Sequence, residues 1–346
     1  MTTAAWARFG HRVARQPVEV VHDLDACGAG FWAVVITFEG AVTAVRFAEV
    51  STLLQADLSH PPPWQPLTGE WTTSLNEAAY IAAVADVRER IAAGTVYQVN
   101  VCRVMSHPLP DEADVGGLAV LLSRGNPAPY AAMILAPDAG LEVVCASPEL
   151  YLRREDERLL SGPIKGTATS AETMLEKDYA ENVMIVDLVR NDLQHVCHPG
   201  TVRVDRLCDL EQHPGLVHLV SDVSGVLRPG TTWRDILAAT FPPGSVSGAP
   251  KHTALQAIAD LEPVPRGPYC GAIGWLEVGT DGTSRAELAV GIRTFWAEWD
   301  DRGRRWLRFG AGSGITWGSD PRAEWVETQL KAARLVGLAS GTVVAG

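Results

Sequence analysis

The chain has 346 residues, of which 47% are hydrophobic and 20% are charged, and its mean hydropathy is +0.04. This composition is typical of a folded protein with one large domain or about two, and it excludes a chain that is disordered throughout. The 41 Asp and Glu residues outnumber the 29 Lys and Arg residues, which gives a net charge of −12. Because no dense basic block interrupts this acidity, we expect neither a nucleic acid nor a membrane as a partner.

The chain also lacks the signals of export. No apolar run reaches the roughly 20 residues that a membrane span needs, and the N-terminus has no basic segment followed by an apolar one. We therefore expect a cytoplasmic protein. The six cysteines form no Cys-x-x-Cys pair, so we expect reduced, mostly buried thiols and no zinc ribbon. They are Cys27, Cys102, Cys145, Cys197, Cys208 and Cys270.

The first residues predict a short β-rich region. Runs at 30–38 and 41–47 are rich in β-branched and aromatic residues and are separated by Glu-Gly, which is typical of a hairpin. The proline-rich segment 59–66 is the clearest break in the chain. We predict a β-rich N-terminal region over 1–65 and a catalytic region over 66–346 that packs as one continuous unit.

Helical and strand-like patterns then follow one another without regular alternation. Apolar residues recur at helical spacing in three segments, which we predict as helices at 74–94, 177–190 and 321–336. Strand-like runs lie at 141–146, 149–154, 216–223, 286–295 and 305–310. Many strands and a few long helices predict a mixed α+β protein with large sheets.

Two of the predicted helices carry acidic pairs. In the last helix Glu324, Glu327 and Lys331 share one face, because offsets of three and seven return to the same side at about 100° per residue. This pattern is typical of a solvated helix face, and it also suits Mg²⁺, which binds one or two carboxylates together with water and substrate oxygens. Asp178 and Glu181 begin the other helix, where acidic residues also complement the helix dipole.

Three basic side chains are further candidates for chemistry. Lys165 stands between Pro-Ile and Gly-Thr after a strand-like run, where it is either a surface turn residue or a desolvated nucleophile. His218 lies in an apolar strand, as a core histidine or a catalyst. Arg293 ends another strand-like run, where it either forms a structural ion pair or binds a substrate carboxylate through two parallel hydrogen bonds. No P-loop or dinucleotide-binding spacing is present.

Taken in order, these segments resemble the chorismate-utilising enzymes, and within them the para-aminobenzoate branch of aminodeoxychorismate synthase component I. The resemblance covers roughly residues 75 to 338. The matching segments are Tyr97-Gln98-Val-Asn100, Ser147-Pro-Glu149, Pro163-Ile-Lys165-Gly-Thr, Ala180-Glu181-Asn182, His218-Leu-Val-Ser221, Phe241 to Lys251, Arg266-Gly-Pro-Tyr269, Ile292-Arg293-Thr294, Gly312 to Gly314 and Glu324-Trp-Val-Glu327. The fold it implies has large, mostly antiparallel β-sheets that form a sandwich-like core flanked by helices.

The resemblance also implies a role for each matching residue. Lys165 would attack C2 of chorismate and form a covalent intermediate before ammonia adds at C4. Glu149 would be the acid or base that aids loss of the C4 hydroxyl, and His218 a local acid, base or orienting group. Mg²⁺ would be held by Glu181 and Glu327, with Glu324 nearby. Substrate would be bound by Gly166, Thr167, Tyr269, Arg293, Gly312, Ser313, Gly314 and Lys331.

The implied product is 4-amino-4-deoxychorismate, for the folate or an antibiotic pathway. No glutaminase motif surrounds any cysteine, so a glutamine amidotransferase subunit is implied as the ammonia donor, although the free chain could use ammonium. The N-terminal region is abbreviated, and the segment at 22–28 does not match the tryptophan-binding segment of the family.

Three alternatives remain at this point. Anthranilate synthases carry alanine in place of Lys165, so this lysine argues against them. Isochorismate or salicylate synthesis is a second alternative. A catalytically silent chorismate-binding protein is the third, and the retention of the full set of site residues argues against it, namely Glu149, Lys165, Glu181, Glu327 and Arg293.

Overall fold

The computed structural model describes residues 5–52, 62–168, 170–174, 176–213 and 216–343. Residues 59–61 of the predicted proline-rich break lie outside these ranges. The helices within them are α1 (Glu77–Ala92), α2 (Val115–Gly125), α3 (Glu176–Gln194), α4 (Trp233–Thr240), α5 (Lys251–Leu261) and α6 (Pro321–Ala339). The strands are β1 (Trp6–Phe9), β2 (Arg12–Val21), β3 (Gly30–Ile36), β4 (Val42–Thr52), β5 (Thr72–Thr73), β6 (Gln98–Pro108), β7 (Tyr130–Ala136), β8 (Leu141–Ser147), β9 (Leu150–Glu155), β10 (Arg158–Gly162), β11 (Ile164–Ala168), β12 (Arg203–His213), β13 (Leu216–Val226), β14 (Gly248–Ala249), β15 (Ala272–Val278), β16 (Ser284–Val290), β17 (Thr294–Trp299) and β18 (Arg305–Ile315).

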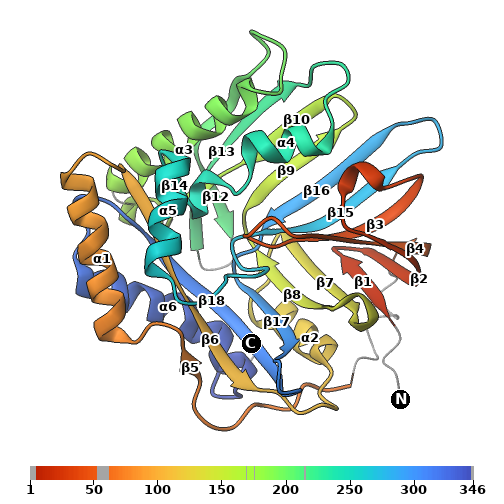
Figure 1. The fold of residues 1–346 in the computed structure, drawn as a ribbon, viewed down its shortest axis with the longest axis horizontal. Coiled ribbons are helices and arrows are strands. Elements are labelled where there is room, and N and C mark those ends of the chain that lie inside the picture. The colour runs from red at the N-terminus through yellow and green to blue at the C-terminus, as the bar shows by residue number, and fades with distance from the viewer. Residues whose placement is uncertain (1–4, 53–61, 169, 175, 214–215, 344–346) are drawn as a thin grey trace.

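The strands join into one connected, strongly folded sheet system (Figure 1). Every strand pairing between the described residues is antiparallel, from β1 with β2 to β7 with β8. The helices lie against this sheet system, mainly at one end. The predicted fold, with large antiparallel sheets flanked by helices, is confirmed.

The N-terminal strands are part of the same sheet system. The predicted hairpin is present as β3 and β4, which pair from Phe31 with Phe47 to Ile36 with Val42. On its other edge β3 pairs along its whole length with β15, a strand from the last third of the chain. Strand β1 pairs with β7 in the same way. Strands β1 and β3 of the N-terminal region are therefore hydrogen-bonded directly to strands of the later region.

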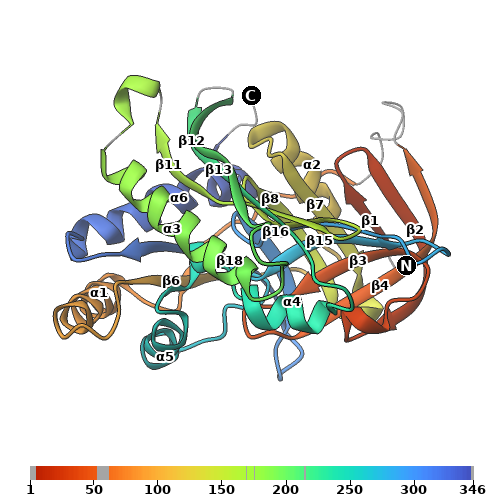
Figure 2. The ribbon, with the colours of Figure 1, turned by 90° about the horizontal axis from the view of Figure 1, so that it is seen from above.

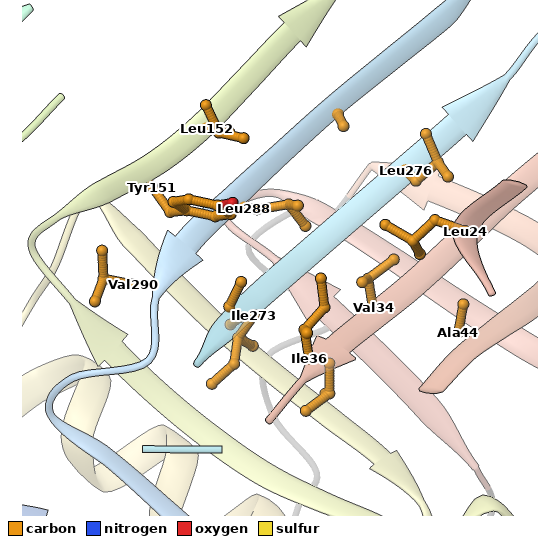
Figure 3. Close-up of a cluster of buried hydrophobic side chains, with 14 of the residues drawn as sticks. Leu24, Val34, Ile36, Ala44, Tyr151, Leu152, Ile273, Leu276, Leu288 and Val290 are labelled. Carbon is orange, nitrogen blue, oxygen red and sulfur yellow. The ribbon is translucent and has the colours of Figure 1, made fainter. Parts of the chain in front are cut away.

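A large apolar core fills the inner face of these strands (Figure 3). The side chains of Val34 and Ile36 on β3 lie beside Ile273 and Leu276 on β15, and Leu288 on β16 continues the layer. All five are at most 1% exposed. Since burial of such a side chain contributes roughly 1.5–3 kcal/mol, this layer holds the N-terminal hairpin on the later strands.

Helices α1, α3, α5 and α6 gather at one end of the molecule, and β1 to β4 lie at the other (Figures 1 and 2). Helix α3 packs on β11, β12 and β13, and α6 packs on β18 and α1. The three predicted helices are confirmed as α1, α3 and α6. This end of the molecule therefore combines the two helices that carry the acidic pairs.

One predicted strand is wrong in its extent. The run at 286–295 is two strands, β16 and β17, separated by Gly291 to Arg293. Arg293 has φ = 53°, a left-handed conformation that ends a strand. The apolar pattern continues across the break because both strands are buried, and a positive φ at arginine has no sequence signal.

Candidate active site

Lys165 lies on β11, beside a break in strand register. β11 pairs with β13, where Lys165 is opposite Leu219 and Thr167 is opposite His218, so the register shifts at Gly166. Gly166 has φ = 72°, and a Cβ built there would lie 2.7 Å from Met174 Sδ. Glycine is required here by both conformation and space. At this register shift β11, the strand that carries Lys165, packs directly against α3.

The ammonium end of Lys165 is directed into the protein. Its Nζ donates a hydrogen bond to the carbonyl oxygen of Ser245 at 3.1 Å. Burial lowers the pKa of Lys165, and the negative charges of Glu149 and Glu181 only partly oppose this shift. The unprotonated amine, which is the nucleophilic form, is thereby favoured relative to a free lysine.

Glu149 lies between β8 and β9 and is only 5% exposed. Its backbone amide donates to the Ser147 hydroxyl at 3.1 Å, which shapes the turn between the strands. Burial raises the pKa of Glu149, and the Ser245 side chain and the charge of Lys165 lower it by less. The site thus holds an amine and a carboxyl group whose environments both favour the neutral form.

The acidic residues of α3 and α6 face the same region. Burial raises the pKa of Glu181, Lys165 lowers it, and Glu327 raises it further, so Glu181 is an electrostatic neighbour of both. On α6 Lys331 Nζ lies 2.7 Å from Glu327 Oε1 and donates to the Gly312 carbonyl oxygen at 3.0 Å. Among the described residues, no cluster of three or more acidic, His or Cys side chains is close enough to hold a metal by itself.

Glu324 has a different environment on the same helix. Its Oε2 is buried and makes no hydrogen bond within the described part of the chain. A buried carboxylate oxygen without a hydrogen-bond partner is costly, so this oxygen suits a bound cation.

The glycine-rich half of β18 packs beneath Tyr269. A Cβ at Gly310 would lie 2.1 Å from Tyr269 Cγ, so only glycine leaves room for this ring. Tyr269 is 4% exposed, and its hydroxyl accepts a weak hydrogen bond from Cys102 Sγ at 3.9 Å. The Ser313 side chain takes the opposite face of the strand, where its hydroxyl lies 2.9 Å from that of Tyr80. Ser313 therefore has only its backbone available on the Tyr269 side.

Arg293 and His218 complete the predicted set. Arg293 is partly buried and forms no ion pair with the residues that the structure describes, and desolvation lowers its pKa. Its carbonyl oxygen accepts from Ala146 N at 3.0 Å, which fixes the backbone at the break. His218 is 3% exposed on β13, opposite Thr167.

Sequence reasoning missed two parts of this arrangement. Ser245 was given no role of its own and was only part of the matching segment Phe241 to Lys251. In the structure its carbonyl oxygen accepts a hydrogen bond from Lys165 Nζ. Gln98 is 1% exposed, and both of its amide atoms are without a hydrogen bond in the described residues. Its Nε2 would lie 2.6 Å from a Cβ at Gly314. A backbone acceptor and a buried amide have no spacing pattern that could have identified them.

The comparisons with known proteins identify the family to which this chain belongs. The sequence profile of the chorismate binding enzymes matches residues 37–337. The chain belongs to this family of chorismate-binding enzymes.

Individual relatives differ in their named activity. Anthranilate synthase component 1 of Aeropyrum pernix is 36% identical over 309 residues, which are 86% of this chain and 67% of that protein. Aminodeoxychorismate synthase component 1 of Bacillus subtilis is 34% identical over 276 residues, 76% of this chain and 56% of that protein. Most of the similar relatives are named anthranilate synthase. The chain spans about half to two thirds of the length of these relatives.

The solved structures agree on the fold. The menaquinone-specific isochorismate synthase of Escherichia coli aligns with a TM-score of 0.80 at 20% identity, over 98% of this chain and 89% of that chain. No helix among the described residues is long and apolar enough to span a membrane.

Proposed function

We propose that this chorismate-binding enzyme aminates chorismate at C4 to give 4-amino-4-deoxychorismate. The observation that carries the proposal is Lys165, whose amine is buried against Ser245 beside Glu149 and Glu181. The resemblance described in the sequence analysis implies alanine at this position in anthranilate synthases, so the lysine favours amination at C4. A buried amine with a lowered pKa can act as a nucleophile in covalent catalysis. A reaction in which the residue at this position takes no part does not need such an amine.

In the proposed mechanism Lys165 and Glu149 act together. The neutral Lys165 amine attacks C2, both ring double bonds shift, and the C4–O bond breaks as Glu149 donates its proton, so that water leaves. Ammonia then forms a bond to C4, both double bonds shift back, and the C2–N bond breaks to release Lys165 as a neutral amine. The proton on the new C4 ammonium returns to Glu149. The overall change is chorismate plus ammonia to aminated product plus water.

Mg²⁺ is the cofactor that we propose, and the residues present fit it. Glu324 has a buried oxygen without a hydrogen-bond partner among the described residues, and the negative charge of Glu327 contributes to the raised pKa of Glu181, which an added cation would relieve. Glu181 and Glu327 would hold the ion, with Glu324 beside it, while water and substrate oxygens complete its shell. When bound, the ion neutralises a substrate carboxylate and stabilises developing negative charge.

The remaining predicted residues would bind and orient the substrate. Arg293 forms no ion pair with a carboxylate in the described part of the chain, so it suits one carboxylate arm of the substrate, and Tyr269 and Lys331 would line the same pocket. Backbone groups of Gly166, Thr167, and Gly312 to Gly314 would add neutral donors. His218 would orient the substrate or move a proton near Thr167.

Ammonia would come from a glutamine amidotransferase subunit. The name "component 1" of the relatives implies a second component for those proteins. We propose the same arrangement for this chain, with ammonium as a substitute in its absence.

Anthranilate synthesis is the second candidate, because most of the similar relatives carry that name. Product analysis by liquid chromatography and mass spectrometry distinguishes the two, after incubation of the chain with chorismate, Mg²⁺ and ammonium. We expect 4-amino-4-deoxychorismate, which disappears when Mg²⁺ is chelated. Anthranilate or isochorismate as the main product would refute the proposed reaction.

The pH dependence gives a second test. The reaction needs Lys165 without its proton and Glu149 with its proton. We expect kcat, measured at saturating free ammonia, to rise with pH as Lys165 deprotonates below the ordinary lysine pKa of about 10.4, and to fall as Glu149 deprotonates above the ordinary glutamate pKa of about 4.3. The Glu149→Gln variant should lose the falling limb and about 10²–10⁴-fold in rate. A falling limb that persists in this variant would exclude Glu149 as its source.

A further inference from the structure

Asn182 follows Glu181 directly on α3, and its side chain is completely buried, at 0% exposed. Successive residues of a helix are about 100° apart around its axis, so neighbouring side chains take different directions. Glu181 is directed toward Lys165 and Glu327, whereas Asn182 is directed toward the sheet on which α3 packs (Figure 2). A buried amide is costly unless it is hydrogen-bonded, so its partners on the sheet matter.

Both ends of the Asn182 amide have partners on the sheet. Its Nδ2 donates to the carbonyl oxygen of Leu219 at 3.1 Å, and its Oδ1 accepts from the Ser221 hydroxyl at 2.5 Å. A weaker contact reaches the same oxygen from Cys208 Sγ at 3.5 Å. The Ser221 hydroxyl in turn accepts from the Cys208 backbone amide at 2.9 Å. Asn182 is thus connected to two strands, β12 and β13.

The strand that Asn182 contacts also leads to the nucleophile. Leu219, whose carbonyl oxygen accepts from Asn182, is the residue opposite Lys165 in the pairing of β13 with β11. On the helix side, Glu181 is close enough to Lys165 for the lysine charge to lower the pKa of this carboxyl group. One side chain therefore connects the strand pair that carries Lys165 with the helix position next to Glu181.

Asn182 also differs in kind from the other contacts of α3. Among the described residues of this helix, the other buried side chains are apolar, namely Ile185, Val186 and Leu193. Apolar contacts are not directional, so by themselves they allow a helix to shift slightly on a sheet. Hydrogen bonds weaken steeply when their geometry is distorted. The amide of Asn182 therefore fixes the position of α3 along β13 in a way that its apolar neighbours do not.

We propose that Asn182 is a positioning residue that, together with Ser221, fixes Glu181 relative to Lys165 and thereby sets the affinity of the site for Mg²⁺. This inference rests on the proposed function, in which Glu181 holds the ion. Mg²⁺ requires a nearly ideal octahedral shell, so a small displacement of one carboxylate weakens its binding. Asn182 itself contacts neither ion nor substrate in this arrangement, and it acts through the position of Glu181.

The test measures Mg²⁺ binding without turnover. Calorimetric titration of Mg²⁺ into the Lys165→Ala chain, saturated with chorismate, gives a Kd in the absence of the covalent step. Asn182→Leu in this chain keeps the branched shape of the side chain and removes its hydrogen bonds. We expect it to raise the Kd about tenfold or more, which is the usual effect of removing a residue that orients a metal ligand. Ser221→Ala should raise the Kd less, because Asn182 keeps its bond to Leu219.

The kinetics with Lys165 retained provide a second readout. Asn182→Leu should raise the Mg²⁺ concentration that gives half of the maximal rate by about the same factor as the Kd. The rate at saturating Mg²⁺ should fall by a smaller factor, because excess ion restores occupancy of the site.

Two control variants separate positioning from general stability. Leu159 on β10 is 0% exposed and lies opposite Gly225 on β13, so Leu159→Ala removes a buried side chain from the same sheet. We expect Leu159→Ala to lower the Tm as Asn182→Leu does, while the Kd for Mg²⁺ remains that of the parent. Cys208→Ala removes only the weakest contact of Asn182 and should leave the Kd within about twofold of the parent value.

The inference is overturned if the Asn182→Leu chain binds Mg²⁺ with the parent Kd, or if Leu159→Ala raises the Kd as much. Should Asn182→Leu fail to fold, an unchanged Kd in Ser221→Ala would overturn it equally. A Lys165→Ala parent that binds no Mg²⁺ in the presence of chorismate contradicts the proposed cofactor and this inference with it. A wild-type chain that forms no 4-amino-4-deoxychorismate contradicts the proposed reaction alone, because the comparison of Kd values does not depend on the product.

Discussion

Replacement of Lys165 by alanine is expected to reduce the formation of 4-amino-4-deoxychorismate by at least about a thousandfold. The physical reason is that Lys165 supplies the electron pair for the first bond, and no other described amine is held at this place, between Ser245 and Glu149. Chorismate binding should change little, because its carboxylate arms are assigned to other residues. The measurement is the initial rate of product formation at saturating chorismate and ammonium.

Lys165→Arg separates nucleophilic from electrostatic action. The guanidinium retains a positive charge but keeps its proton throughout the accessible pH range, so it cannot attack C2. We expect this variant to be as inactive as Lys165→Ala. If Lys165→Arg retained a large part of the wild-type rate, Lys165 would act through its charge and the covalent mechanism would be wrong.

Replacement of Arg266 by methionine is expected to lower the free energy of unfolding by about 3–5 kcal/mol. The Arg266 side chain is 1% exposed and lies 2.5 Å from the Glu262 carboxylate, which would be left buried without its partner. The same guanidinium donates to the carbonyl oxygens of Val246 and Asn100, both at 2.8 Å. It therefore ties the segment that contains Ser245 to β6.

The measurement for this variant is denaturant unfolding followed by tryptophan fluorescence. Arg322→Met is the matched control, because Arg322 is 78% exposed and its contact with Glu77 is long, at 3.6 Å. Such a surface pair contributes about 0–1 kcal/mol. The double variant Arg266→Met/Glu262→Met should recover part of the lost stability, because it removes the uncompensated charge. Equal losses in Arg266→Met and Arg322→Met would show that the buried pair contributes no more than an exposed one.

The sequence predicted the helices and most strands because their apolar spacing matches the helical or strand period. Helices α1, α3 and α6 each bury one side, which leaves a clear pattern. The break at Arg293 could not be predicted, because a positive φ depends on the backbone around it, here the hydrogen bond from Ala146 N. The pairing of β3 with β15 could not be predicted either, because the spacing of apolar residues within a strand does not determine which strand it pairs with.

The side chains of the candidate site could be proposed from the sequence. The backbone groups that contact them, and the extent to which they are buried, could not. Lys165 and Glu181 stood out by residue type and spacing, and Glu149 by resemblance to a family. The Ser245 carbonyl oxygen and the pairing of Asp192 with Lys251, 59 residues apart, depend on how the segment after α4 folds over α3. Likewise, Ser313 faces Tyr80 because alternate residues of a strand point to opposite sides, and the sequence does not say which side is which.

The most direct test of the central claim is the mass of the intact chain after mixing with chorismate and Mg²⁺ in the absence of any nitrogen donor, with the reaction stopped in acid. The proposed mechanism predicts a species heavier by chorismate less one water, with the added mass on the peptide that contains Lys165, and its disappearance when ammonium is added before the acid. Unmodified protein at every time point, from a preparation that forms 4-amino-4-deoxychorismate when ammonium is supplied, would contradict a covalent role for Lys165.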